Sequence, residues 1–299
     1  MKQKKEAVDL VSTIIAGYAK HFGKEITRLD YLPDKDEVAD IISLLRKLLF
    51  PGYFNKGAAD SAGINCAVEA LAADIKMKLN RQICRTLNLD AGQDEKCYAM
   101  AGKAEELCNA FLQTIPGIIE VLSTDVQATY DGDPAAKNKH EIIFTYPGIF
   151  AISIYRLAHQ LHLLSVPLIP RMMTEHAHSL TGIDIHPGAD IGPYFCIDHG
   201  TGIVIGETTK IGSHVKLYQG VTIGALSTQG GQNLRSKKRH PTLEDNVVIY
   251  SGATILGGET VIGKGSVIGG NVFITQSVQS NTKVNVKNHE LEYKKRKSS

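Results

Sequence analysis

The 299-residue chain lacks several features that would indicate a secreted, membrane-bound or nucleic-acid-binding protein. Its five cysteines are an odd number without Cys-x-x-Cys spacing, which favours reduced thiols over a disulfide frame or a zinc site. No apolar run approaches the roughly 18 residues of a membrane span. The formal net charge of +2 is too small to indicate nucleic acid. We therefore expect a cytoplasmic protein without a membrane or nucleic-acid partner.

The first half of the chain has apolar residues at helical spacing. One such face begins after Asp34, a candidate N-cap, and ends before Pro51. Similar stripes run through residues 61–88 and 147–161. Stripes of this kind are typical of helices that pack into a bundle. We expect an α-helical N-terminal domain over residues 1–180.

From residue 183 the period becomes six, because an aliphatic residue heads nearly every group of six. Neither the period of two of a strand nor the 3.6 of a helix explains this. A six-residue repeat is typical of a parallel β-helix, in which three repeats make one triangular coil and the aliphatic heads stack inside. About four coils fit into residues 181–278, so the predicted fold class is α+β. The heads are Ile185, Ile191, Ile197, Ile205, Ile211, Leu217, Ile223, Leu243, Ile249, Ile255, Ile262, Ile268 and Ile274.

The repeat has two irregularities. Two extra residues fall around His199, and a long excursion at residues 225–242 interrupts the coils. Departures from a solenoid repeat form loops on one face, which is often the binding face. After the solenoid, residues 279–299 are expected to form a basic C-terminal tail.

Asp184 and His199 are the candidate catalytic pair. They are 15 residues apart, close to one coil of about 18, so they approach each other on neighbouring coils. An aspartate–histidine pair can deprotonate an alcohol, because the histidine accepts the proton and the aspartate fixes its tautomer. Arg239 and His240 form a second cluster, where a guanidinium could bind a carboxylate or remain a solvated loop charge.

A metal site at His176 and His178 is not expected. Two residues two apart on a helix point away from each other, so one ion could not easily take both. We predict no metal.

Several motifs together resemble the serine acetyltransferases, a family of hexapeptide-repeat acyltransferases. The likeness covers roughly residues 120–275. The repeat alone fits many acyltransferases, whereas the combined set is specific. The motifs are Asp125-Val126-Gln127-Ala128, Asp133-Pro134-Ala135, Tyr155-Arg156-x-x-His159, Asp184-Ile185-His186-Pro187, Asp198-His199-x-Thr201-Gly202-Ile203-Val204-x-Gly206-Glu207-Thr208 and Arg239-His240-Pro241.

This resemblance implies a left-handed β-helix and direct transfer of the acetyl group of acetyl-CoA, the co-substrate, to the hydroxyl of L-serine. That reaction is the first step of cysteine biosynthesis from serine. By the same resemblance, His199 is the general base, Asp184 its partner, and His240 a further catalytic residue. Serine's ammonium group is held by Asp133 and Asp198, and its carboxylate by Arg239 and His240. The positions implied for the pantetheine arm of CoA are Gly224, Ala225, Ser251 and Gly270.

The resemblance also implies an assembly and regulation. Members form homotrimers with active sites between subunits, and two trimers commonly join into hexamers. L-cysteine usually inhibits by occupying the serine site. Many members dock a terminal isoleucine into O-acetylserine sulfhydrylase, but this sequence ends at Ser299, so a tight complex is doubtful.

Three alternatives remain open. A related acyltransferase could act on a sugar or antibiotic hydroxyl, which requires the histidine base but neither Asp133 nor Arg239. A zinc hydratase of the carbonic anhydrase type requires three histidines on one metal, which this solenoid does not obviously provide. A scaffold without activity would leave the acid–base residues unexplained.

Overall fold

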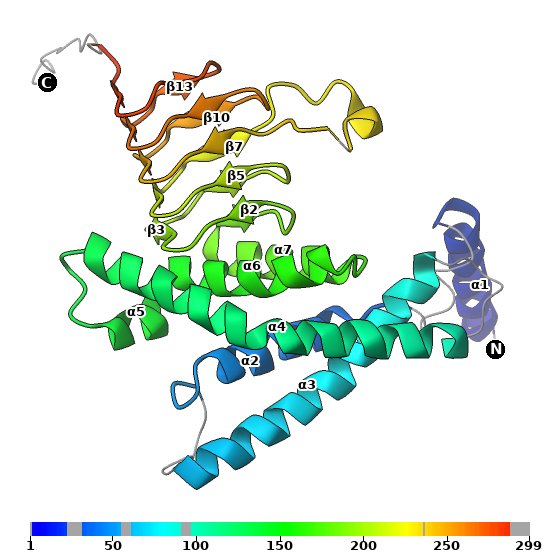
Figure 1. Ribbon diagram of the computed structural model, residues 1–299. Coiled ribbons are helices and arrows are strands. Elements are labelled where there is room, and N and C mark those ends of the chain that lie inside the picture. The colour runs from blue at the N-terminus through cyan, green and yellow to red at the C-terminus, as the bar shows by residue number, and fades with distance from the viewer. Residues whose placement is uncertain (1, 23–31, 55–60, 91–96, 236, 288–299) are drawn as a thin grey trace, which may run out of the picture. The chain divides into compact units, whose positions relative to one another are not determined.

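The computed structural model describes residues 2–22, 32–54, 61–90, 97–235 and 237–287 (Figure 1). The prediction about the sulfhydrylase complex falls on the chain end and lies outside these residues. Contacts divide the chain into two compact units: Met1–Thr114 with Leu161–Met172, and Ile115–Gln160 with Met173–Ser299. The domain boundary predicted after residue 180 lies where the helices end and the strands begin. It stays a prediction.

Helices form over the three stretches where the apolar spacing predicted them, which correspond to α2, α3 and α6. Asp34 caps α2, because its side chain accepts hydrogen bonds from the backbone of Asp36 and Glu37. The apolar face of α2 is buried and packs against α3. The helices among the described residues are α1 (Lys2–Phe22), α2 (Lys35–Leu49), α3 (Ser61–Asp90), α4 (Cys97–Gly132), α5 (Lys139–Thr145), α6 (Pro147–Leu163) and α7 (Ile169–Thr181).

The solenoid is a parallel β-helix, which confirms the predicted α+β class. All thirteen aliphatic heads are at most 7% exposed. Three parallel sheets of five, four and five strands form its faces. The solenoid is therefore longer than the expected four or so coils. The extra length arises because the repeat continues into β14, which pairs with β12. The first sheet contains β1 (Asp184–Ile185), β4 (Val204–Ile205), β7 (Thr222–Gly224), β10 (Thr254–Leu256) and β13 (Phe273–Ile274). The second contains β2 (Asp190–Ile191), β5 (Lys210–Ile211), β8 (Thr242–Leu243) and β11 (Val261–Ile262). The third contains β3 (Cys196–Asp198), β6 (Lys216–Tyr218), β9 (Val248–Ile249), β12 (Val267–Ile268) and β14 (Lys283–Val284).

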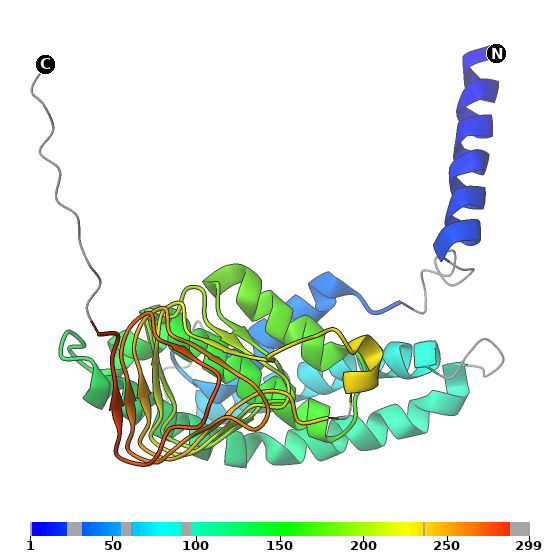
Figure 2. The ribbon, with the colours of Figure 1, turned by 90° about the horizontal axis from the view of Figure 1, so that it is seen from above.

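Successive coils lie above one another, as Figure 2 shows from above. Two corners of the triangular coil carry predicted site residues. The His199 corner joins the third sheet to the first and consists of residues 199–203, 219–221, 250–253 and 269–272. The Arg239 corner joins the first sheet to the second and consists of residues 186–189, 206–209, 225–235, 237–241 and 257–260. The excursion at this second corner carries the short 3₁₀ helix η3 (Gly231–Leu234) and projects from the coils in Figure 2.

A buried ion pair connects the second half of α4 to α6 and to the first coil. Asp125 is fully buried and lies 3.0 Å from Nε of Arg156. Arg156 also donates to the carbonyl oxygens of Ile191 and Gly192. Removing one partner of such a pair leaves an uncompensated buried charge and costs about 3–5 kcal/mol. This pair therefore fixes the end of α4, and with it Asp133, against the solenoid.

Among the described residues, no single helix is long and apolar enough to cross a membrane. The α5–α6 pair passes the length and composition test only when the two are taken together, across a bend of 74°. The interior of α6 is buried within the protein, including Ile152, Ile154 and Leu157.

Candidate active site

His199 lies at the tip of a tight turn produced by the two extra residues of the repeat. Its φ of 58° is left-handed, which is uncommon for any residue other than glycine. Its side chain is 72% exposed, and Nε2 lies 3.6 Å from Oδ1 of Asp198. The other carboxylate oxygen of Asp198 pairs with Nζ of Lys216, 2.9 Å away. The solenoid thus presents an accessible imidazole beside a fixed carboxylate.

Asp133 follows the last residue of α4 and belongs to the same cluster. Its Oδ2 accepts a 2.6 Å hydrogen bond from the hydroxyl of Tyr146, and its Oδ1 accepts one from the backbone of Ala135. The hydrogen bond from Tyr146 is the main cause of the lowered pKa of Asp133, and the charges of Lys216 and His199 lower it further. The same hydrogen bond raises the pKa of Tyr146 to about 12. Asp133 is therefore an anion at neutral pH.

Asp184 lies one coil below the His199 turn. The backbone N–H of Gly202 donates to the carbonyl of Gly182 at 2.8 Å, which seats the turn directly on the segment that leads into Asp184. Gly200, with a φ of 92°, packs so closely that a Cβ there would come within 2.5 Å of Cδ1 of Ile183. The general-base role of His199 and its pairing with Asp184 remain predictions.

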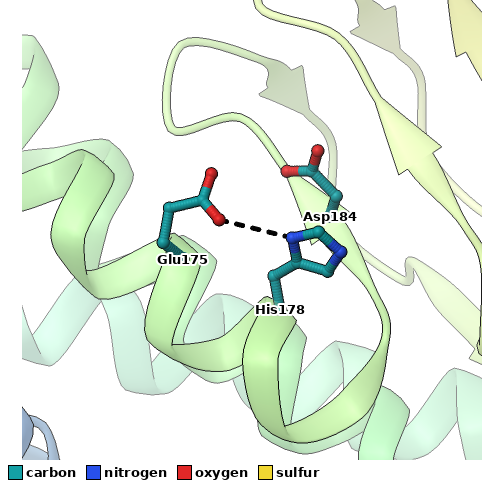
Figure 3. Close-up of side chains that lie close together, drawn as sticks. All are labelled: Glu175, His178 and Asp184. Atoms are coloured by element: carbon teal, nitrogen blue, oxygen red, sulfur yellow. Dashed lines mark hydrogen bonds and ion pairs between the residues drawn. The ribbon is translucent and has the colours of Figure 1, made fainter.

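Asp184 also has neighbours on α7. Its carboxylate and the side chains of Glu175 and His178 place their ligand atoms within 4.8 Å of one another (Figure 3). Nδ1 of His178 lies 3.3 Å from Glu175. Two carboxylates and an imidazole are a donor set that can hold a divalent cation. This group contains His178 but not His176, so the two histidines do not contribute to one set of ligand atoms. The predicted absence of a metal stays a prediction.

Arg239 and His240 lie at the Arg239 corner. The guanidinium of Arg239 forms an ion pair with Glu207 and donates to the carbonyl of Leu234 at 3.3 Å. A cavity of about 480 Å³ opens beside it and is also lined by Thr228. The arginine is thus held in place with part of its surface facing an open space.

His240 is a fixed neutral donor. Its Nδ1 accepts a 3.1 Å hydrogen bond from the backbone N–H of Thr208, so in the neutral ring the proton resides on Nε2. Burial, reinforced by the neighbouring charge of Arg239, lowers the pKa of His240 to about 4. The ring packs over Gly206, where a Cβ would come within 2.1 Å of it. At neutral pH, His240 can donate through Nε2 but carries no charge.

The four positions predicted for CoA divide between the two corners. Ser251 and Gly270 lie at the His199 corner, where the backbone of Asn271 donates to the carbonyl of Ser251 at 2.9 Å. Gly224 ends β7, and Ala225 begins the excursion at the Arg239 corner. That these four residues bind CoA stays a prediction.

The structure brings Asp133, Asp198 and His199 together at one corner and Arg239 with His240 at another. Sequence reasoning missed Tyr146 and Lys216. It included Glu207 and Thr208 in a motif but gave no role to them, and they hold the second cluster. Lys216 had a usable signal, because the extra residues at the His199 turn lengthen that coil to 20 residues and pair Cys196 with Lys216. Tyr146 had none, since its contact with Asp133 depends on how the segment after α4 folds back.

A solenoid of six-residue repeats with an exposed histidine between carboxylates defines an acyltransferase of the hexapeptide-repeat class. No family model matches the chain. The plasmid serine acetyltransferase of Synechococcus elongatus is 45% identical over 254 residues, which cover 83% of this chain and 79% of that protein. The serine acetyltransferase of Helicobacter pylori is 48% identical over 45% of this chain and 75% of its own length.

Solved structures agree with these relatives. Entamoeba histolytica serine acetyltransferase isoform 3, in complex with cysteine, is 37% identical with a TM-score of 0.72, covering 86% of this chain and 84% of that one. Serine acetyltransferase 1 of the same organism, in complex with L-cysteine, has a TM-score of 0.70 at 37% identity, covering 85% and 87%. The chain belongs to the serine acetyltransferase family.

Proposed function

We propose that this protein transfers the acetyl group of acetyl-CoA to the hydroxyl of L-serine, giving O-acetyl-L-serine and CoA. The observation that carries the proposal is the cluster of Asp133, Asp198 and His199, which combines an accessible base with two carboxylates suited to an ammonium group. An acyltransferase for a sugar or antibiotic hydroxyl would require the histidine base but neither Asp133 nor Arg239, which suit the two charges of an amino acid. The names of the relatives support the same substrate.

In this proposal His199 accepts the proton of the serine hydroxyl as the oxygen attacks the thioester carbonyl. The tetrahedral intermediate then collapses, the carbon–sulfur bond breaks, and the proton passes from His199 to the CoA sulfur. Asp184 holds the imidazolium in orientation. Nε2–H of neutral His240 and the guanidinium of Arg239 receive the serine carboxylate.

We further propose that the complete site forms between subunits of a homotrimer. Gly202 and Gly206, which flank β4 at the two corners, are four residues apart, about 13 Å along an extended strand. One serine molecule cannot reach from the base at one corner to Arg239 at the other. A neighbouring copy related by three-fold symmetry would supply the missing corner. Hexamer formation from two trimers and inhibition by L-cysteine belong to the same proposal, as do a cytoplasmic location and the predicted domain boundaries.

The test is CoA release from acetyl-CoA with L-serine, compared with L-threonine, L-homoserine and a simple sugar. We expect serine to be preferred over each of the others. Thiol release with serine no higher than the blank would contradict the proposed function. Preference for the sugar would favour the alternative acyltransferase.

A further inference from the structure

Lys216 on β6 is a nearly buried cation inside the His199 cluster. Its side chain is 16% exposed, and Nζ lies 2.9 Å from Oδ2 of Asp198. The same Nζ donates a 2.7 Å hydrogen bond to the carbonyl of Gly132, the last residue of α4. It also lies over the ring of Tyr218, 4.6 Å from the centroid. One ammonium group therefore connects two segments that are 84 residues apart.

The contact of Lys216 with Gly132 is made at the residue that directly precedes Asp133. The carbonyl groups at the end of a helix carry partial negative charge, which a cation stabilises. The side chains of Lys216 and Cys196 surround Gly132: a Cβ there would lie 3.4 Å from Nζ and 3.8 Å from Sγ, which is ordinary van der Waals contact. Lys216 thus holds Asp198 directly and Asp133 through the preceding residue.

We propose that Lys216 is a positioning residue that orders both carboxylates of the serine ammonium site and balances one of their two charges. Asp133, Asp198 and Lys216 together then carry one excess negative charge, which matches a single ammonium group. The inference rests on the proposed function but concerns a residue that contacts the carboxylates rather than the substrate.

The charge state of Lys216 agrees with this role. Burial favours its neutral form, but hydrogen bonds to Tyr218 and Asp198 outweigh burial and raise its pKa. The ammonium group therefore stays charged throughout the pH range in which a histidine base would act.

A second lysine–aspartate pair of the solenoid provides a matched control. Nζ of Lys264 lies 3.6 Å from Asp245, and the two side chains are 61% and 46% exposed. Exposed pairs of this kind contribute little to stability. Lys264→Met thus makes the same chemical change away from both corners.

The experiment compares Lys216→Met, Lys216→Gln and Lys216→Arg with Lys264→Met in steady-state assays of the full chain from pH 5.5 to 9. Because a desolvated carboxylate loses its charged partner, Lys216→Met should lower kcat/KM for serine about tenfold or more and change KM for acetyl-CoA by less than about twofold. Lys216→Arg should recover most of the loss. Lys264→Met should match the wild-type protein.

The pH profile separates positioning from simple folding. Asp198 of β3 lies 3.6 Å from Nε2 of His199, and the charge of His199 acts on Asp133. Lys216 of β6 pairs with Asp198, and Tyr146 donates to Asp133. Asp184 of β1 is the predicted partner of His199. Removing the one cation among them favours the imidazolium, so the acid limb of kcat/KM should move to higher pH by about half a unit to one unit in Lys216→Met. Lys216→Gln keeps a hydrogen-bond donor without the charge, so it should show the same shift with a smaller loss of rate.

If Lys216→Met is folded by circular dichroism, and its kcat/KM and acid limb match the wild-type protein, the inference is wrong. If Lys216→Met does not fold, Lys216→Gln is compared with Lys216→Arg, because only the second keeps the charge. Equal pH profiles of kcat/KM in these two variants would also overturn the inference. Wild-type protein that releases no CoA with serine would instead contradict the proposed function.

Discussion

The two corners of the solenoid differ in charge and exposure, although the same coils build both. The His199 corner presents an imidazole that is 72% exposed, with the carboxylates of Asp198 and Asp133 beside it. The Arg239 corner holds an arginine against Glu207 and a buried histidine whose pKa is about 4. The first suits an ammonium group and a proton transfer, and the second a carboxylate. The difference supports the proposal that one chain carries two unlike halves of an amino-acid site.

The largest expected effect tests the chemistry of the His199 corner. His199→Ala should lower kcat about 10²–10⁴-fold, because it removes the general base. Asp184→Asn should cost less, since the base remains but loses its orienting partner. His214→Ala is the control: His214 is also exposed and left-handed, but it stacks on Tyr194 at the third corner and should retain wild-type kcat. Near wild-type turnover in folded His199→Ala would rule out the assignment.

A mixing experiment tests whether the corners belong to one site. Chains carrying His199→Ala and chains carrying Arg239→Ala are co-refolded in equal amounts. If each site takes one corner from each of two neighbours, random assortment leaves about a quarter of the sites intact, so about a quarter of wild-type activity should return. Activity no higher than the mean of the separate variants would mean that each chain forms its own site.

The Arg239 corner should act on serine binding. Arg239→Ala removes a charge-assisted contact with the carboxylate, so KM for serine should rise about 10- to 100-fold while KM for acetyl-CoA stays nearly constant. Arg235→Ala, which removes a neighbouring guanidinium that lines the same cavity, should raise serine KM less. A response confined to acetyl-CoA would instead assign Arg239 to the CoA phosphates.

The smallest expected effect is on stability and distinguishes the buried histidine from the exposed one. The pKa of His240 is lowered from 6.5 to about 4, so the unfolded chain takes up this proton first as the pH falls. The stabilisation is complete above pH 6.5 and is lost between about 6.5 and 4, which amounts to about 2 kcal/mol between pH 7 and pH 5. Urea unfolding at both pH values should show His240→Asn losing this part of the dependence. An identical pH dependence in the wild-type protein and His240→Asn would contradict the assignment of His240 as a buried, neutral histidine.

Much of the fold could be predicted because its signals are local. The six-residue period predicts the stack, since every head must be buried, and all thirteen heads are buried. Asp34 caps α2 as expected, because a cap depends only on the next few residues. The site was predicted less completely. His199 and Asp198 were found from a break in the repeat and from a family resemblance, whereas Tyr146 was not found, because its contact with Asp133 has no periodic signature.

The sequence by itself determined the α+β class, the solenoid and the location of its irregular turns, because burial of periodic aliphatic residues leaves few alternatives. Only the tertiary structure decided which polar groups meet. The contact of Lys216 with Gly132 spans 84 residues and depends on a 20-residue coil and on the position of the end of α4. The separation of Arg239 from His199 follows from which corner each turn occupies. Such relations depend on register and docking across the whole unit, which no short stretch of sequence specifies.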